Sequence, residues 1–278
     1  MLFVSTVDPI ALTLGPLEIR WYGLLFSGGF VIGYFLMQLM FRRRKWNTED
    51  LDRMLVCMFL GTIVGARLGH CLIYEPDYFL SHPVEILKIW KGGLASHGGA
   101  LGVILVMAWF CKRCHYSFME LGDMMVIPTA LVCCLIRLGN FMNSEIVGIP
   151  TGGDYGVIFT ALGEDFPRHP AQLYEAACYL AIFLLLSALY AFWKRRGSGM
   201  LFGLFILLVF LSRFLIEYVK VEQADYSTGS ALTVGQYLSI PFIIAGAVIM
   251  LLAHLGRFGR AGRAQAAPHD QKEVLNGH

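Results

Sequence analysis

The segment 137–145 carries the side chains that could do chemistry. Its sequence, Arg-Leu-Gly-Asn-Phe-Met-Asn-Ser-Glu, places an arginine, two asparagines and a carboxylate directly after the apolar run 121–136. A second polar pair, Arg213 and Glu217, lies near the end of the apolar run 200–219. Their i, i+4 spacing puts both side chains on one face of a helix. Ionisable groups in such places are costly, so a functional site is the default interpretation.

The composition indicates a membrane protein. Of the 278 residues, 56% are hydrophobic and only 15% are charged, and several runs approach the ~20 apolar residues that cross a bilayer. The 22 basic and 20 acidic side chains nearly balance, so charge gives no reason to expect nucleic acid as a partner. The first 14 residues lack the basic region of a cleavable signal, and we expect them in the mature protein. The expected fold class is an all-α polytopic membrane protein.

Seven transmembrane helices are expected, at 21–41, 54–74, 94–111, 121–137, 171–193, 200–219 and 235–255. Lysine and arginine gather after the first, third, fifth and seventh of these runs, and loops rich in these residues stay cytoplasmic. The N-terminus is therefore expected to be extracytoplasmic and the C-terminus cytoplasmic. Residues 1–257 would form one catalytic transmembrane domain with a small extracytoplasmic head region at about 140–170. Residues 258–278 would form a flexible cytoplasmic tail.

With this orientation, five of the seven spans direct a polar group toward the outer leaflet, at ~1.5 Å of helix rise per residue. These groups are Tyr22, Arg67, His97, Arg137 and Arg213. Small residues accompany two of them. The rows are Gly61, Gly65 and Gly69 around Arg67, and Gly98, Gly99 and Gly102 after His97. Rows of this kind let two helices approach closely.

Each polar group also has a purely structural interpretation, which the sequence leaves open. The alternatives are snorkelling for Arg67, packing for His97, an aromatic belt for Tyr22, a helix-tying pair for Arg213 and Glu217, and helix capping for Asn140 and Glu145.

Motifs for metals, cofactors and nucleophiles give no support for those chemistries. Cys111-Lys-Arg-Cys114-His115 matches the C-x-x-C-H pattern of haem attachment, but its basic residues place it at a cytoplasmic helix end, the wrong side for that chemistry. The remaining cysteines lie in apolar runs, where thiols behave as small hydrophobes. We expect no metal and no cofactor. Because no nucleophile motif is present, the nucleophile of an enzyme of this kind would arrive with a substrate.

Four motifs together resemble one family. They are Trp-Tyr-Gly at Tyr22, Gly-Gly-Leu-Ala-Ser-His-Gly-Gly at 92–99, Arg-Leu-Gly-Asn-Phe-Met-Asn-Ser-Glu at 137–145 with Gly148, and Arg-His-Pro-Ala-Gln-Leu-Tyr-Glu at 168–175. In this order and spacing they resemble the bacterial prolipoprotein diacylglyceryl transferases, from about Gly15 to Leu252. The chain departs from the family pattern at Val209, where tyrosine is usual, and at Lys220-Val-Glu, where Arg-x-Pro is usual.

The resemblance implies a reaction and its partners. The diacylglyceryl group of phosphatidylglycerol would pass to the lipobox cysteine thiol of a preprolipoprotein signal peptide, forming a thioether and releasing glycerol phosphate. This reaction is the first step of bacterial lipoprotein maturation. The enzyme would be a multi-pass protein of the cytoplasmic (inner) membrane, with its active site facing the outer leaflet.

The resemblance also assigns roles to residues. Arg137 and Arg213 would bind the phosphate, because a guanidinium forks onto phosphate oxygens and keeps its charge. His97 would be the general base, since free imidazole titrates near ~6.5 and a free thiol near ~8.5. Tyr22 or a carboxylate remains an alternative base. Further substrate-binding residues would be Tyr22, Arg67, Asn140, Glu145, Gly148 and Glu217.

Two other classes of protein remain as alternatives. A membrane transporter would also bury arginines, but the chain shows no repeated half with matching broken helices. A non-catalytic protein that binds anionic lipid would use the same arginines without needing His97.

Overall fold

The computed structural model describes residues 2–192, 198–221 and 232–258. The chain divides into two compact units, and each is described by itself. The larger unit comprises Met1–Asp52 and Met119–Phe258, and the smaller contains Arg53–Phe118. The basic residues 194–196 and, apart from Phe258, the expected tail 258–278 lie outside the described residues.

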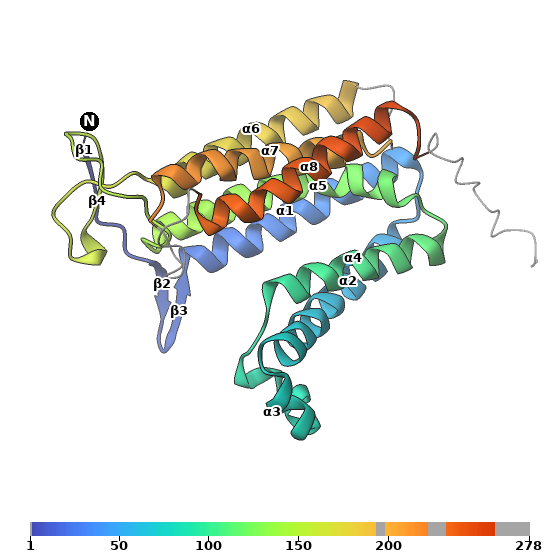
Figure 1. The fold of residues 1–278 in the computed structure, drawn as a ribbon, viewed down its shortest axis with the longest axis horizontal. Helices are drawn as coiled ribbons and strands as arrows, with labels where there is room; N and C mark the ends of the chain where they lie inside the picture. The colour runs from blue at the N-terminus through green and yellow to red at the C-terminus, as the bar shows by residue number, and fades with distance from the viewer. Residues whose placement is uncertain (1, 193–197, 222–231, 259–278) are drawn as a thin grey trace, which may run out of the picture. The chain divides into compact units, whose positions relative to one another are not determined.

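The larger unit is a helical bundle (Figure 1). Its long helices are α1 (Trp21–Arg44), α5 (Phe118–Met142), α6 (Ala171–Phe192), α7 (Met200–Ile216) and α8 (Val234–His254). Glycines set the close contacts between them. A Cβ on Gly33 of α1 would lie 3.2 Å from Pro128 of α5, and one on Gly203 of α7 would lie 2.9 Å from the carbonyl oxygen of Gly246 of α8. Small residues therefore bring these apolar helices together.

The smaller unit is built on a pair of helices that cross at glycines. It contains α2 (Thr48–Gly69, from Arg53 onward), a π-helical turn (His70–Tyr74), α3 (Pro76–Ser81), two 3-10 turns (Pro83–Leu87 and Ile89–Lys91) and α4 (Ser96–Cys114). A Cβ on Gly65 would lie 2.4 Å from the carbonyl oxygen of Gly98, and one on Gly69 would lie 2.8 Å from its Cα. The predicted close approach of the two glycine rows is confirmed.

Six helices among the described residues are long and apolar enough to cross a membrane. They are Trp21–Arg44, Thr48–Tyr74, Phe118–Met142, Ala171–Phe192, Met200–Val219 and Val234–His254. The expected span 94–111 coincides with α4, which is helical but is not among the six. The first turn of this 19-residue helix contains His97 and two glycines, and its last turn contains Lys112 and Arg113. These residues lower the mean hydropathy of the helix. The seventh span stays a prediction.

The expectation of an all-α chain needs correction, because four short strands accompany the helices. β1 (Leu2–Ser5) pairs in parallel with β4 (Gly156–Phe159), and β2 (Ile10–Leu14) forms an antiparallel hairpin with β3 (Leu17–Arg20). The alternating Ile-Ala-Leu-Thr-Leu sequence of β2 suits a strand, and Gly15 supplies the positive φ of the turn. The strands lie at one end of the bundle (Figure 1).

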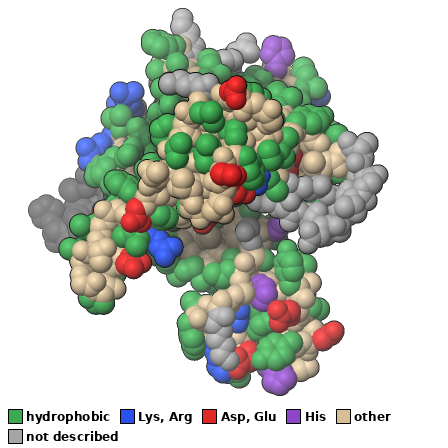
Figure 2. Space-filling model, turned by 90° about the vertical axis from the view of Figure 1, so that its left-hand side faces the viewer, with side chains coloured by type: hydrophobic (Ala, Val, Ile, Leu, Met, Phe, Trp, Pro, Cys, Tyr) green, Lys and Arg blue, Asp and Glu red, His purple; other side chains and the backbone are tan. Residues whose placement is uncertain are grey.

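We call β1 together with residues 143–170 the head segment. Its core is small: Val157 and Phe159 of β4 pack with Phe141, and the Thr160 hydroxyl donates to the carbonyl of Ser5 at 2.7 Å. Seen end-on, this end of the larger unit shows acidic side chains among polar, backbone and apolar atoms (Figure 2). The described core of the head segment is therefore a small cluster.

The crossing of α2 and α4 generates a packing prediction. Gly65→Leu should lower the free energy of unfolding by roughly 1–3 kcal/mol, because its side chain would overlap backbone atoms of α4. Gly28→Leu is the matched control, since no atom lies within 4 Å of a Cβ at Gly28. Thermal unfolding in detergent micelles measures both variants. Equal midpoints for the two would contradict the close approach.

Candidate functional site

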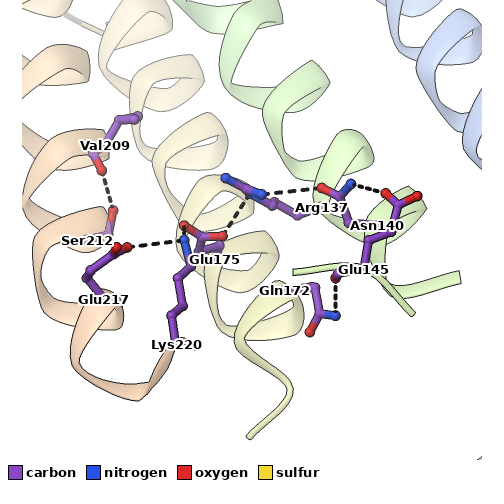
Figure 3. Close-up of polar contacts among 9 residues, drawn as sticks. All are labelled: Arg137, Asn140, Glu145, Gln172, Glu175, Val209, Ser212, Glu217 and Lys220. Atoms are coloured by element: carbon purple, nitrogen blue, oxygen red, sulfur yellow. Dashed lines mark hydrogen bonds and ion pairs between the residues drawn. The ribbon is translucent and has the colours of Figure 1, made fainter. Parts of the chain in front are cut away.

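A continuous chain of polar side chains joins the end of α5, the start of α6 and the turn after α7 (Figure 3). In order, its members are Glu217, Lys220, Glu175, Arg137, Asn140 and Glu145. All lie in the larger unit, at the end that carries the head segment. Three of the predicted site residues, Arg137, Asn140 and Glu145, are therefore brought together.

The first half of this chain is made of ion pairs. Lys220 Nζ lies 2.8 Å from Glu175 Oε1 and 3.6 Å from Glu217 Oε2. The other oxygen of Glu175, Oε2, lies 2.8 Å from Arg137 Nε. The Glu175 side chain is 0% exposed, so both of its cationic partners act in a low-dielectric setting.

The second half is made of hydrogen bonds. Arg137 Nη1 donates to Asn140 Oδ1 at 3.3 Å, and Asn140 Nδ2 donates to Glu145 Oε2 at 3.2 Å. The Gln172 amide donates to the backbone carbonyl of Glu145 at 2.5 Å. Asn140 therefore spans the space between the arginine and the carboxylate, which requires the i, i+3 spacing of Arg137 and Asn140 on α5.

The site contains buried residues to which the sequence reasoning gave no role. Gln172 and Glu175 are both fully buried near the start of α6, and Lys220 is 7% exposed. The signal that could have found Glu175 is its place in the apolar run 171–193, where a lone carboxylate requires a cationic partner. Gln172 and Glu175 both belong to the Arg-His-Pro-Ala-Gln-Leu-Tyr-Glu motif at 168–175.

The two predicted phosphate-binding arginines retain free nitrogen atoms. Arg137 Nε lies in the ion pair with Glu175 and Nη1 donates to Asn140, whereas within the described ranges Nη2 has no partner. Arg213 on α7 is half-buried, and its side chain makes no hydrogen bond or ion pair with any described residue. Arg213 lies one helical turn before Glu217, the first member of the polar chain. Each of the two cations therefore has unused donors.

Arg213 and Glu217 keep the expected i, i+4 relation, because Glu217 has helical dihedral angles and its N–H donates to the Arg213 carbonyl. Their side chains nevertheless form no ion pair with each other, and a 3-10 turn (Glu217–Val219) follows the α-helix. The carboxylate instead faces Lys220 and packs against Gly235, where a Cβ would lie 2.1 Å from Oε1. The ion pair of Glu217 in the described chain is with Lys220.

Tyr22 lies beside this chain of polar groups. Its ring packs directly on Gly139, where a Cβ would come within 2.8 Å of Tyr22 Cδ2. Only glycine leaves room there for the ring, one residue before Asn140. Among the described residues the Tyr22 hydroxyl has no hydrogen-bond partner, so it remains available to a ligand.

Gly148 has a backbone role in the structure. Its N–H donates to the carbonyl of His169 at 2.9 Å, and the next residue, Ile149, donates to the carbonyl of Val219 at 2.9 Å. A Cβ on Gly148 would lie 2.5 Å from both of these carbonyl oxygens. The glycine therefore lets two parts of the head segment and the turn after α7 meet at one point.

Arg168 fixes the head segment next to Gly148. Its guanidinium donates to both oxygens of Glu164 and, through Nη1 at 3.1 Å, to the carbonyl of Gly148. The hydrogen bond from Arg168 lowers the pKa of the Glu164 carboxyl from its ordinary value. The ion pair therefore persists at neutral pH and holds the backbone on which the site depends.

Arg67 and His97 belong to the smaller unit. The buried Arg67 guanidinium donates to the carbonyls of Glu85, Ile86 and Gly92 at 2.6, 2.9 and 2.6 Å, so its described contacts hold the segment between α3 and α4. His97 is exposed in the first turn of α4, with no partner among the described residues. A catalytic role for His97 and a substrate contact for Arg67 both stay predictions.

A family model and curated relatives all point to one protein family. A family model described as prolipoprotein diacylglyceryl transferase matches residues 9–252. The chain is 55% identical to a phosphatidylglycerol–prolipoprotein diacylglyceryl transferase of Tolumonas auensis, over 91% of this chain and 98% of that protein. Proteins of the same name from Chloroherpeton thalassium and Porphyromonas gingivalis are 44% and 42% identical, each over 88% of this chain and 91% and 93% of their own lengths.

Proposed function

The chain belongs to the prolipoprotein diacylglyceryl transferase family, and on that premise we propose the reaction it catalyses. It transfers the diacylglyceryl group of phosphatidylglycerol to the thiol of a lipobox cysteine in a preprolipoprotein. The products are a thioether-linked lipoprotein precursor and glycerol phosphate. The protein is thus a transferase of bacterial lipoprotein biosynthesis.

The observation that carries this proposal is the pair of arginines with unused donors. Arg137 Nη2 and the whole Arg213 guanidinium have no partner within the described part of the chain, although both lie in an apolar bundle. Free guanidinium groups in such a setting suit a phosphate, which accepts two parallel hydrogen bonds from one arginine. Asn140, Glu145 and Glu175 orient Arg137, and Tyr22 and Glu217 border the same site.

In the proposed reaction, the cysteine sulfur attacks the glyceryl carbon that bears the phosphate ester. A carbon–sulfur bond forms, the carbon–oxygen bond breaks, and its electron pair leaves with the phosphate oxygen. The two arginines neutralise the charge that develops on this oxygen. His97 takes the proton of the thiol, and Tyr22 or a carboxylate is the alternative base.

The proposed setting is the inner membrane, with seven spans, an extracytoplasmic N-terminus, a cytoplasmic C-terminus and a site open to the outer leaflet. Basic residues support this orientation: Arg42, Arg43 and Arg44 end α1. In the larger unit, the polar chain and the head segment lie at the opposite end of α1, which is the end where it begins (Figure 1). The head segment is then the extracytoplasmic head region, beside the lipid headgroups.

Substitution of Arg137 tests phosphate recognition. Arg137→Ala should lower kcat/KM for phosphatidylglycerol by roughly 10²- to 10³-fold, as expected for loss of a charge-stabilising donor. Arg137→Lys should rescue it poorly, because one ammonium cannot serve Glu175, Asn140 and a phosphate together. The assay uses purified protein, labelled phosphatidylglycerol and a lipobox peptide. Arg43→Lys, at an exposed position, is the control. Near-normal turnover of Arg137→Lys would exclude the bidentate role.

The role of His97 is tested by a pH–rate comparison. His97→Asn keeps a hydrogen bond but cannot act as a base, so transfer should fall by roughly 10²- to 10⁴-fold near neutral pH. Raising the pH should recover part of the rate, because more substrate thiol ionises unaided. His254→Asn, at an exposed position near the end of α8, controls for loss of a histidine. If His97→Asn keeps the wild-type pH profile, the base is another group.

Reporter fusions test the orientation. A reporter after Arg196, a position outside the described residues, should read as cytoplasmic, and one inserted near Gly163 should read as extracytoplasmic. A fusion after Phe258 serves as a second cytoplasmic reference. The reverse pattern would place the site in the inner leaflet and reject the proposed topology.

A further inference from the structure

Lys220 is a buried cation at the centre of the polar chain, to which no role in the reaction has been given. It follows the turn after α7, and its side chain is only 7% exposed. Its backbone is fixed by a β-bridge to Gly148. An ammonium group in such a place is costly unless paired, and Lys220 meets this need with Glu175 at 2.8 Å.

Lys220 and Arg137 share one partner, the Glu175 carboxylate, and this sharing determines the net charge beside the proposed phosphate site. Alone with Arg137, the Glu175 carboxylate would form a neutral ion pair, and a neutralised guanidinium attracts a phosphate weakly. Because Lys220 takes one carboxylate oxygen and Arg137 the other, the three residues together carry two positive charges and one negative charge. Glu217 compensates less, since it lies 3.6 Å from Lys220 and its side chain is 15% exposed.

We propose that Lys220 is a positioning residue of the phosphate site, which acts through Glu175 on Arg137. By sharing the buried carboxylate, it leaves Arg137 with an uncompensated charge, while Glu175 still holds Nε and leaves Nη2 free for the lipid phosphate (Figure 3). This inference rests on the proposed function, and it concerns how the site attracts its anionic substrate.

The test is a double-mutant cycle between Lys220 and Glu175 in the purified full-length protein. The variants are Lys220→Met, Lys220→Arg, Glu175→Gln and the double variant Lys220→Met/Glu175→Gln. Lys112→Met is the matched control, because Lys112 is exposed on α4 of the smaller unit and is not a member of the polar chain. The readouts are KM and kcat for phosphatidylglycerol at saturating lipobox peptide, with size-exclusion chromatography as the check of folding.

Lys220→Met should raise KM for phosphatidylglycerol by roughly 10- to 100-fold, the range of a charge-assisted hydrogen bond, because Glu175 then neutralises Arg137. Lys220→Arg should restore KM, because it returns the charge. Glu175→Gln in the Lys220→Met background should also recover at least half of the loss on a logarithmic scale, since it removes the neutralising carboxylate. The double variant is expected to fold even where Lys220→Met does not, because it leaves no buried carboxylate without a full set of partners.

Two outcomes of the double-mutant cycle would overturn the proposal. A double variant with a KM as high as that of Lys220→Met, or higher, would overturn the proposal and leave Lys220 a purely structural role. Unchanged KM in Lys220→Met would overturn it too. Failure of the proposed function looks different, because wild type and Lys112→Met would then both fail to modify the lipobox peptide.

Discussion

The buried carboxylate of Glu175 is the interaction on which the arrangement of the site depends. One oxygen faces Arg137 of α5 and the other faces Lys220 after α7, so a single side chain of α6 ties three parts of the larger unit together. Breaking a buried pair by removing one partner costs about 3–5 kcal/mol, because a charge is left uncompensated. Glu175 is therefore the residue that holds Arg137 in place in this site.

Glycine provides the second constraint. Several polar side chains of the site lie against glycine residues, at positions where a Cβ atom would collide with them. Tyr22 lies against Gly139, and the Glu217 carboxylate lies against Gly235, each closer than a Cβ would allow. Gly148 lets the carbonyl groups of His169 and Val219 approach its backbone. The same device joins helices in both units. Close backbone approach thus positions both the scaffold and the site.

Much of the fold could be predicted from the sequence, because apolar runs and the residues that end them are local signals. The predicted starts of α1, α6 and α7 coincide with the observed ones, and Pro170 and Gly199 directly precede the last two. The expected 54–74 span begins six residues late, because the first turns of α2 contain polar residues that a hydropathy run excludes. The strands were missed because each is only four or five residues long.

The site could be predicted only in part, because only contacts between residues close in sequence leave a local signal. Arg137, Asn140 and Glu145 are neighbours in sequence, so their contact follows from helix geometry. The partnership of Glu175 with Lys220 spans 45 residues and has no local signature. The partners of Arg67 are backbone carbonyl groups, which every residue has, and its fixed position could not be read from side-chain types.

Charge balance explains why a phosphate-binding site of this kind contains acids as well as bases. A phosphodiester lipid carries one negative charge, whereas the departing phosphate monoester carries about 1.5 to 2 near neutral pH. Arginines alone would stabilise the developing charge but would also retain the product. In the proposed site, Glu175 and Glu217 would oppose part of that attraction, and Lys220 would set how much of it Arg137 keeps. The alternation of charge sign along the polar chain would then balance capture of the lipid against release of glycerol phosphate.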